Sequence, residues 1–229
     1  MQVYVINALN ELSDAEFECA LSKIDPEQKD RITRFHFIED KKRALAGILL
    51  SKYAIVKAFG ISSDEIIVEK NKYGKPHVVG KRGVHFNISH SGDYVVCAVA
   101  DSPVGIDVQE HKSGGLDIAE RFFSQEEKDA LNRASDSEDE KRKLFYDMWS
   151  LKEAYIKCIG MGLYKPLDEF GIVKKDGEYK LCENGEESGE YQFMRYEFEG
   201  DYSLCVCSKG AEIPEKYTLV SYKEILRLV

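Results

Sequence analysis

The sequence predicts an α+β protein made of two similar halves that pack together as a pseudo-dimer. Each half shows a long amphipathic helix, then an Asp-Glu pair before a β-like run, and later an apolar strand. The tripeptide Gly-Asp-Tyr introduces that strand twice, at Gly92 and at Gly200. A turn at residues 101–103 separates the halves, which we expect over residues 1–102 and 103–229. A site formed by both halves would lie in the cleft between them.

The elements of the first half follow from local patterns. The N-terminal residues predict a strand followed by a capped helix. A long helix is predicted over Ile38–Phe59, because apolar residues recur there at helical spacing and Gly60 follows as a stop. Phe86 lies in a strand that we expect to end in a turn at residues 89–92. The apolar run Tyr94–Ala100 is the clearest strand of this half.

The second half shows the same kinds of pattern. Apolar residues alternate over residues 104–108 and predict a strand. A short helix is expected over residues 124–132, because Ser124 and the glutamate three positions later fit a capping box. Residues 141–159 form the second long helix, which a glycine again ends, and residues 202–207 form an apolar strand.

Composition and charge exclude several classes of protein. The chain has 229 residues, of which 32 are basic and 41 acidic, and its net charge is −9. We therefore expect no nucleic-acid partner, because such a partner needs a basic surface. No apolar run is long enough to span a membrane, and no signal peptide is recognisable. Six cysteines without zinc-binding spacing complete the prediction of a cytoplasmic protein with reduced thiols.

A carboxylate interrupts an apolar strand at Asp107. Since Val104, Ile106 and Val108 alternate, Asp107 and Gln109 share the opposite face of the strand. Oxygen ligands of this kind suit a hard metal ion, and a solvent-facing edge strand is the simpler alternative.

The second long helix carries an unusual face. Trp149, Glu153 and Lys157 are spaced four residues apart, so the only tryptophan shares a face with a carboxylate and an ammonium group. This face predicts either a metal and phosphate site or a surface ion pair of little energetic weight.

Two loops carry groups suited to a phosphate. Ser89 and His90 offer a hydroxyl and an imidazole in the predicted turn, where backbone N–H groups are also exposed. An ordinary hairpin turn and a Ser/His hydrolase are alternatives, although adjacent side chains on an extended backbone would diverge. Lys75, between a glycine and a proline, is expected to project from a rigid loop.

In this order and spacing, these pieces resemble the signature of the Sfp-type 4′-phosphopantetheinyl transferases. The resemblance runs from Tyr4 to about Leu226 and includes Arg34-Phe35, Glu39-Asp40 and Gly160-x-Gly162-Leu163. Its main blocks are Gly74-Lys75-Pro76, Phe86-Asn87-Ile88-Ser89-His90-Ser91, Gly105-Ile106-Asp107 and Trp149-Ser150-x-Lys152-Glu153-Ala154-Tyr155-x-Lys157.

The resemblance implies a pseudo-dimer with its site in the central cleft. It also implies an enzyme that moves the phosphopantetheine arm of coenzyme A onto a serine of an apo carrier protein and releases adenosine 3′,5′-bisphosphate. Mg²⁺, or alternatively Mn²⁺, would be bound by Asp107 and Glu153, with Gln109 as a third ligand. Glu153, directly or through a metal-bound water, would take the serine proton, and Lys157 would support the transferring phosphate.

The same resemblance implies a binding site for coenzyme A. Ser89 and His90 would hold its phosphates, and His90 is also expected among the catalytic residues. Lys75 would lie near the adenosine end, and two arginines would cradle the 3′-phosphate. The implied coenzyme A-binding residues are Arg31, Arg43, Lys75, Ser89, His90 and Lys157.

Three positions depart from the family pattern. Gln109 stands where an acidic metal ligand is usual, and an amide oxygen brings no charge. Gln28 and Ala44 replace a lysine and a hydroxyl residue, which predicts a weaker hold on coenzyme A. A non-catalytic module that binds coenzyme A or a nucleotide is the alternative function, and Gln109 is the feature that favours it.

The implied partner is an apo acyl or peptidyl carrier protein. Since carriers are usually acidic, a net charge of −9 predicts docking through local features. Apolar residues after the Asp107 strand either contact the carrier or pack in the core of the second half; they are Leu116, Ile118, Phe122 and Phe123. Because two halves supply both sides of the cleft, the resemblance predicts a monomer.

Overall fold

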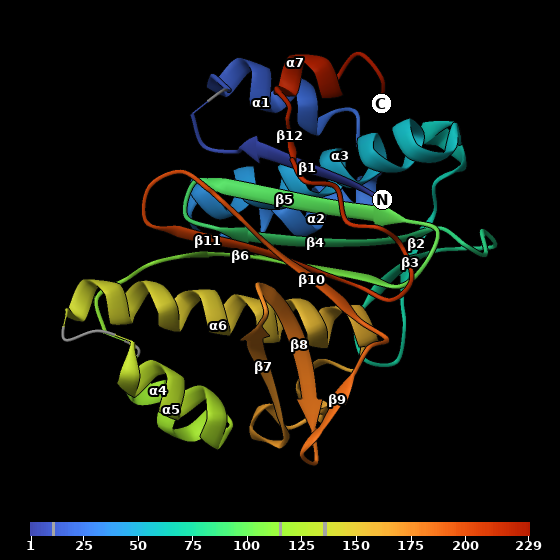
Figure 1. Cartoon of the computed structure of the whole chain (residues 1–229). Helices are drawn as coiled ribbons and strands as arrows, with labels where there is room; N and C mark the ends of the chain where they lie inside the picture. Colours follow the sequence, from blue (N-terminus) through green and yellow to red (C-terminus); the bar gives the residue numbers. More distant parts are fainter. Residues whose placement is uncertain (11, 115, 135–136) are drawn as a thin grey trace.

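The computed structural model describes residues 1–10, 12–114, 116–134 and 137–229, and its elements form four layers (Figure 1). Helix α3 (Ile38–Phe59) covers a four-stranded sheet, and helix α6 (Glu138–Ile159) covers a three-stranded sheet. The two sheets pack face to face between these helices. The α+β prediction is confirmed.

The remaining elements surround these layers. The other helices are α1 (Asp14–Leu21), α2 (Pro26–Thr33), α4 (Leu116–Phe122), α5 (Gln125–Arg133) and α7 (Tyr222–Ile225), with 3₁₀ turns η1 (Ser63–Glu65), η2 (Gly162–Tyr164) and η3 (Leu167–Glu169). The four-stranded sheet has the order β12 (Thr218–Leu219), β1 (Gln2–Asn7), β5 (Tyr94–Ala100) and β4 (His85–Ser91). The three-stranded sheet has the order β10 (Gln192–Tyr196), β11 (Tyr202–Ser208) and β6 (Val104–Glu110). Two smaller sheets contain β2 (Val68–Lys70) with β3 (Pro76–Val78), and β7 (Phe170–Lys175), β8 (Glu178–Glu183) and β9 (Glu186–Ser188). No helix of the described ranges combines the length and the apolar character needed to cross a membrane.

The two main sheets repeat one antiparallel arrangement. The strand that follows Gly-Asp lies in the middle of each, with β5 between β1 and β4 and β11 between β6 and β10. A 3₁₀ turn comes between the long helix and the next strand in both halves, as η1 and as η3. Cys97 and Cys205 occupy equivalent places, since each faces the long helix of its own half. These correspondences confirm the predicted pseudo-dimer.

Both long helices end where the sequence predicts. Gly60 and Gly160 adopt left-handed conformations, with φ of 66° and 70°, which glycine reaches without the steric cost of a Cβ atom. The second helix begins three residues earlier than predicted, at Glu138. The predicted capping box of α5 is also present, because the side chains of Ser124 and Glu127 each accept a backbone N–H of the other residue.

The central strands are apolar throughout because both of their faces are buried. In β5, Cys97 and its alternate neighbours pack under α3, whereas Val96 and Ala98 pack against the opposite sheet. In β11, Val206 faces that same interface, while Cys205 packs under α6. Strands buried on both sides lose the polar alternation of a surface strand.

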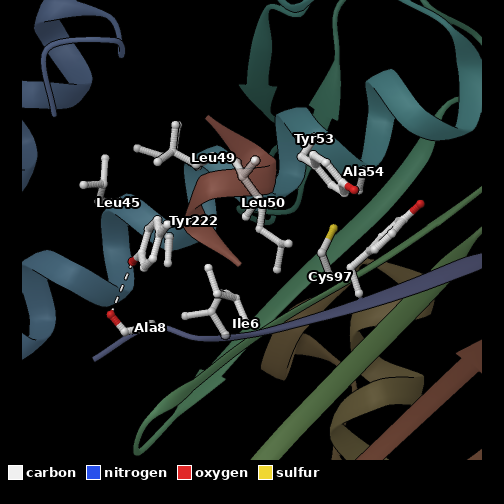
Figure 2. Packing of buried hydrophobic residues seen from close by; sticks show 14 of the residues in the cluster. Ile6, Ala8, Leu45, Leu49, Leu50, Tyr53, Ala54, Cys97 and Tyr222 are labelled. Carbon is white, nitrogen blue, oxygen red and sulfur yellow. Dashed lines mark hydrogen bonds between the residues drawn. The ribbon is translucent and has the colours of Figure 1, made fainter. Parts of the chain in front are cut away.

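The C-terminal segment returns to the first half. Strand β12 pairs in parallel with β1, and α7 packs in the core under α3. In Figure 2, Tyr222 lies among Leu45, Leu49 and Ile6, and its hydroxyl donates a hydrogen bond to the Ala8 carbonyl oxygen at 3.3 Å. The division at residue 102 stays a prediction, but residues 218–225 pack against the half opposite to the one predicted for them.

The halves also meet along a seam between β4 and β6. No backbone hydrogen bond joins these two strands, both of which are described in full. Instead, the Asn87 side chain accepts the Ile106 N–H at 2.9 Å, and the Ser91 hydroxyl accepts the Glu110 N–H at 3.0 Å. Ser89, between them on the same face of β4, therefore also points toward β6.

Candidate active site

Helix α6 lies unusually close to β6, and Gly105 makes this possible. A Cβ atom at this position would lie 2.0 Å from the Ala154 carbonyl oxygen and 2.4 Å from the Cys158 nitrogen. Since Gly105 and Asp107 share one strand face, the same contact brings the last turns of α6 over Asp107. Glycine is thus needed here for close approach rather than for a turn.

Three side chains meet at the seam between the halves. The Lys157 ammonium lies 2.6 Å from Asp107 Oδ1 and 2.9 Å from Ser89 Oγ. The Ser89 hydroxyl in turn donates to Asp107 Oδ1 at 2.9 Å. Asp107 and Ser89 are buried, while a quarter of the Lys157 side chain remains exposed. The first half thus contributes one of the three groups and the second half two.

The other oxygen of Asp107 has no hydrogen-bond partner among the described residues. Oδ2 is buried and accepts no hydrogen bond within the described part of the chain. Gln109 lies two residues along on the same strand face, and the side chains of Gln109 and Glu153 make no hydrogen bond to another described residue. Two carboxylates and an amide supply only oxygen ligands, the type that Mg²⁺ prefers. The residues present therefore fit a small divalent cation.

The charge around Glu153 also favours a bound cation. Burial raises the pKa of its carboxyl group, the neighbouring Asp107 carboxylate raises it further, and Lys157 lowers it in part. A carboxylate pair with one ammonium group nearby keeps a net negative charge, which an additional cation would neutralise.

A groove of about 1310 Å³ runs along the first half beside this site. It lies between α2, α3, β2, β3 and β4, and Phe86, Ile88 and Ile48 form part of its apolar lining. Arg31 and His90 line it as well, together with Gln28 and Ala44 at the two departures noted in the sequence. Arg31 is exposed and has no ion pair within the described ranges.

His90 lies in this groove among cations. Desolvation lowers the pKa of its imidazole, Arg43 and Lys157 lower it further, and Asp40 opposes them. The structure therefore favours a neutral imidazole near pH 7. Arg43 itself donates to the Gly92 carbonyl oxygen at 2.9 Å and to Asp40 Oδ1 at 2.6 Å. Of the two predicted arginines, Arg31 is in the groove lining and Arg43 braces the turn after β4.

The predicted turn at residues 89–92 is wrong, because β4 continues to Ser91. An extended backbone sends adjacent side chains to opposite faces, so Ser89 points to β6 and His90 into the groove. Ser89 Oγ forms hydrogen bonds with Asp107 and Lys157, and with no imidazole of the described residues. The arrangement lacks the nucleophile and base of a Ser/His hydrolase.

The expected projection of Lys75 is also wrong. Its ammonium donates to the Cys158 and Val104 carbonyl oxygens, at 2.9 and 3.0 Å, and burial lowers its pKa. Carbonyl groups in the last turn of a helix have no partner within the helix and carry partial negative charge. Those at the end of α6 therefore attract the lysine ammonium inward. Lys75 therefore anchors the loop before β3 to the end of the helix that carries Lys157.

Two of the four apolar residues suggested for carrier contact pack in the core. Phe123 is 1% exposed, and Phe122 packs edge-on against Trp149 with ring centres 6.0 Å apart. Ile118 is exposed, and the Leu116 side chain lies outside the described residues. The alternative of core packing therefore holds for both phenylalanines.

Sequence patterns missed a fully buried ion pair behind the site. Lys152 Nζ lies 2.6 Å from Glu127 Oε2 and donates to the Phe170 carbonyl oxygen at 2.6 Å. Glu127 Oε1 accepts the Ile172 N–H, so the pair joins α5, α6 and β7. Glu127 belongs to the predicted capping box and Lys152 to the motif on the second long helix. Nothing in the sequence around either residue indicated that their side chains would meet.

Comparisons with known proteins agree with this geometry. A family model described as "4′-phosphopantetheinyl transferase, N-terminal" matches residues 11–102, and one described as "4′-phosphopantetheinyl transferase superfamily" matches residues 103–207. The 4′-phosphopantetheinyl transferase Sfp of Bacillus subtilis (strain 168) is 37% identical over 99% of this chain and 100% of its own length. The 4′-phosphopantetheinyl transferase gsp of Aneurinibacillus migulanus is 32% identical over 91% of this chain and 86% of its own. The L-aminoadipate-semialdehyde dehydrogenase-phosphopantetheinyl transferase of Mus musculus is 32% identical over 94% of this chain and 76% of its own. The chain therefore belongs to the family of Sfp-type 4′-phosphopantetheinyl transferases and is an enzyme of that class.

Proposed function

We propose that the chain transfers the 4′-phosphopantetheine arm of coenzyme A to a serine hydroxyl of an apo acyl or peptidyl carrier protein. The reaction depends on Mg²⁺ and releases adenosine 3′,5′-bisphosphate. The observation that carries this proposal is the buried, unpartnered Oδ2 of Asp107, beside Lys157 and Glu153 where the two halves meet.

Coenzyme A occupies the groove of the first half. The guanidinium of Arg31 binds the 3′-phosphate, and the neutral imidazole of His90 donates a hydrogen bond to the pyrophosphate. Arg43 and Lys75 hold the adjoining turn and loop in place through backbone carbonyl groups. The apolar lining accommodates the uncharged parts of the cosubstrate.

Asp107, Gln109 and Glu153 would hold the metal. Its chemical contribution there would be positive charge beside the pyrophosphate. Ser89 orients both Asp107 and Lys157 through its two hydrogen bonds, so the charged groups are already positioned before the substrate arrives.

The transfer exchanges one phosphorus–oxygen bond for another. The serine oxygen forms a bond to the phosphorus of the phosphopantetheine arm, while the bond from that phosphorus to the bridging pyrophosphate oxygen breaks. Glu153 accepts the serine proton, which a weak hydroxyl nucleophile must lose. Lys157 stabilises the charge on the departing adenosine 3′,5′-bisphosphate.

Intact-protein mass spectrometry tests the proposal. An apo carrier protein is incubated with the enzyme and coenzyme A, with Mg²⁺ or with a chelator. We expect a metal-dependent gain of one phosphopantetheine mass, and no gain with the E153Q variant, which should still bind coenzyme A. A gain without metal, or none with either carrier type, would contradict the proposal.

The site needs no second subunit, because one chain provides both sides of it. We therefore also propose that the enzyme is a monomer. Its six free cysteines and its net charge of −9 support the further proposal that it acts in the cytoplasm without a nucleic-acid partner. A molar mass near 26.1 kDa in light scattering would support the first of these statements.

A further inference from the structure

Three large apolar side chains are exposed within four residues between α2 and α3. Phe35, Phe37 and Ile38 are 42%, 62% and 44% exposed, and we call them the 35–38 patch. The other exposed large apolar side chains of the described residues are more scattered along the chain; they are Ile67, Val79, Ile118, Met161, Tyr164, Leu219 and Leu228. Single exposed apolar residues are ordinary, but such a concentration marks an interaction surface.

The patch also places an unfavourable residue at the start of α3. Phe37 is the N-cap of α3 and makes no side-chain cap hydrogen bond. Serine, threonine, aspartate or asparagine at this position would satisfy a free N–H group and stabilise the helix. A residue that is unfavourable for the helix and exposed to water is better explained by a function than by folding.

The patch is connected to the end of β4, the strand that carries Ser89 and His90. Asp40 and Arg43, in the next turn of α3, connect it to the carbonyl oxygen of Gly92, two residues after His90. With a rise of about 1.5 Å per residue, Ile38 and Arg43 are about 7.5 Å apart along the helix. On its other side the patch continues into α2, whose Arg31 lines the coenzyme A groove. A protein resting on the patch would thus present its surface at the His90 end of the groove.

The charge around the patch differs from that of the whole chain. Residues 29–43 contain six basic and three acidic side chains, although the net charge of the chain is −9. Lys42 and Arg43 already bind groups within the chain, so the remaining basic side chains of this segment are those available to a partner; they are Lys29, Arg31, Arg34 and Lys41. An apolar centre flanked by such cations is complementary to a partner with apolar side chains surrounded by carboxylates.

From these observations we propose that the 35–38 patch is the docking surface for the apo carrier protein, which contacts it through an apolar area with an acidic rim beside the acceptor serine. This inference rests on the proposed transfer to a carrier. Phe37 contributes most of the contact, because it is the most exposed of the three side chains.

The F37S variant separates docking from folding. Serine is a good N-cap, so the melting temperature should rise by about 2–4 °C. The KM for the apo carrier should rise about tenfold, because a buried aromatic anchor is lost. The dissociation constant for coenzyme A, measured by calorimetry, should stay unchanged. A purely structural role for Phe37 would instead lower the melting temperature and leave the carrier KM unaffected.

L219S is the matched control. Leu219 is 61% exposed, close to the value for Phe37, but lies on the edge strand β12 of the first half. The same change there should leave the carrier KM unaltered.

The first measurement is carrier modification by the unaltered enzyme, followed by mass spectrometry. Its absence would contradict the transfer itself. If transfer occurs and F37S leaves the carrier KM unchanged, the docking proposal alone is wrong. If F37S lowers stability, hydrogen exchange of the unaltered enzyme tests the docking proposal instead. Added carrier should slow amide exchange over residues 35–42. Unchanged exchange rates would overturn the proposal.

Discussion

At the scale of single residues, the missing side chain of Gly105 determines how close α6 comes to the site. We predict that G105A destabilises the protein by about 3 kcal/mol and abolishes transfer, because its Cβ would overlap the backbone of α6. Urea unfolding and the carrier mass assay measure both effects.

Gly47 provides the matched control for this change. A Cβ atom there would lie 3.7 Å from a methyl group of Ile88, an ordinary contact in the interior of α3. G47A should therefore stabilise the protein by about 0.5–1 kcal/mol, since alanine favours a helix over glycine. Destabilisation by both variants to the same extent would mean that close approach at position 105 has no special importance.

Gln109 sets the charge of the proposed metal site. We predict that Q109E binds Mn²⁺ about tenfold more tightly in calorimetry, because a third carboxylate joins Asp107 and Glu153 on the cation. E110Q is the control: the Glu110 carboxyl group lies beside Gly92 on the other side of the strand, so its loss should not change the affinity. Equal affinities of Q109E and the unaltered protein would place the metal away from residue 109.

Spacing predicted which side chains share a face but not which faces meet. It placed Glu153 and Lys157 on one face of a helix, and the structure brings both near Asp107 of β6, a meeting that only the family resemblance implied. Lys75 could not be placed in this way. Whether a lysine points to solvent or to buried carbonyl groups depends on a helix end that is 83 residues away in the sequence.

At the scale of elements, the buried pair of Lys152 and Glu127 holds α5 and β7 against α6. We predict that K152M destabilises the protein by about 3–5 kcal/mol, because it leaves a buried carboxylate without its cation. Chemical denaturation gives the difference.

The pair of Lys209 and Glu190 is the matched comparison. Both side chains are exposed, and their charged atoms are 2.8 Å apart. K209M should leave the free energy of unfolding unchanged, since water screens exposed pairs. A large effect at Lys209, or none at Lys152, would contradict the assignment of stability to the buried pair.

Long elements with a clear period were predictable from the sequence, and short ones were not. The spacing in α3 predicted both of its ends, since a helix of 22 residues repeats its apolar face many times. The sequence predicts that strand β4 ends before Ser89, because its polar residues are typical of a turn, whereas the strand continues to Ser91. Those polar residues form hydrogen bonds with the neighbouring β6. Their partners lie 19 residues further along the chain, so the sequence around β4 does not indicate this pairing.

At the scale of the whole molecule, the halves share one core. Val96 and Ala98 of the first sheet pack against Ile106 and Val206 of the second, and the C-terminal segment crosses back to the first half. We therefore predict a single unfolding transition, with the calorimetric enthalpy equal to the van't Hoff enthalpy. Two separate transitions in scanning calorimetry would mean that the halves are independent domains.

The fold class was predictable because the repeat involves the largest elements. The order of helix, 3₁₀ turn and strands recurs in both halves, and each strand after Gly-Asp is central in its sheet. The return of residues 218–225 to the first half was not predictable, because β12 has two residues and α7 has four. Pairing of such short segments depends on the surface that they meet.

The seam between β4 and β6 has a consequence for how this enzyme can change. Strands joined by a backbone ladder keep a fixed spacing whatever their sequence, but these two are joined through Asn87, Ser89 and Ser91. The spacing between the two strands thus depends on side chains, which a single substitution can lengthen or shorten. Substitutions at positions 87 and 91 should therefore change how the two halves are held together, while the interior of each half stays as it is.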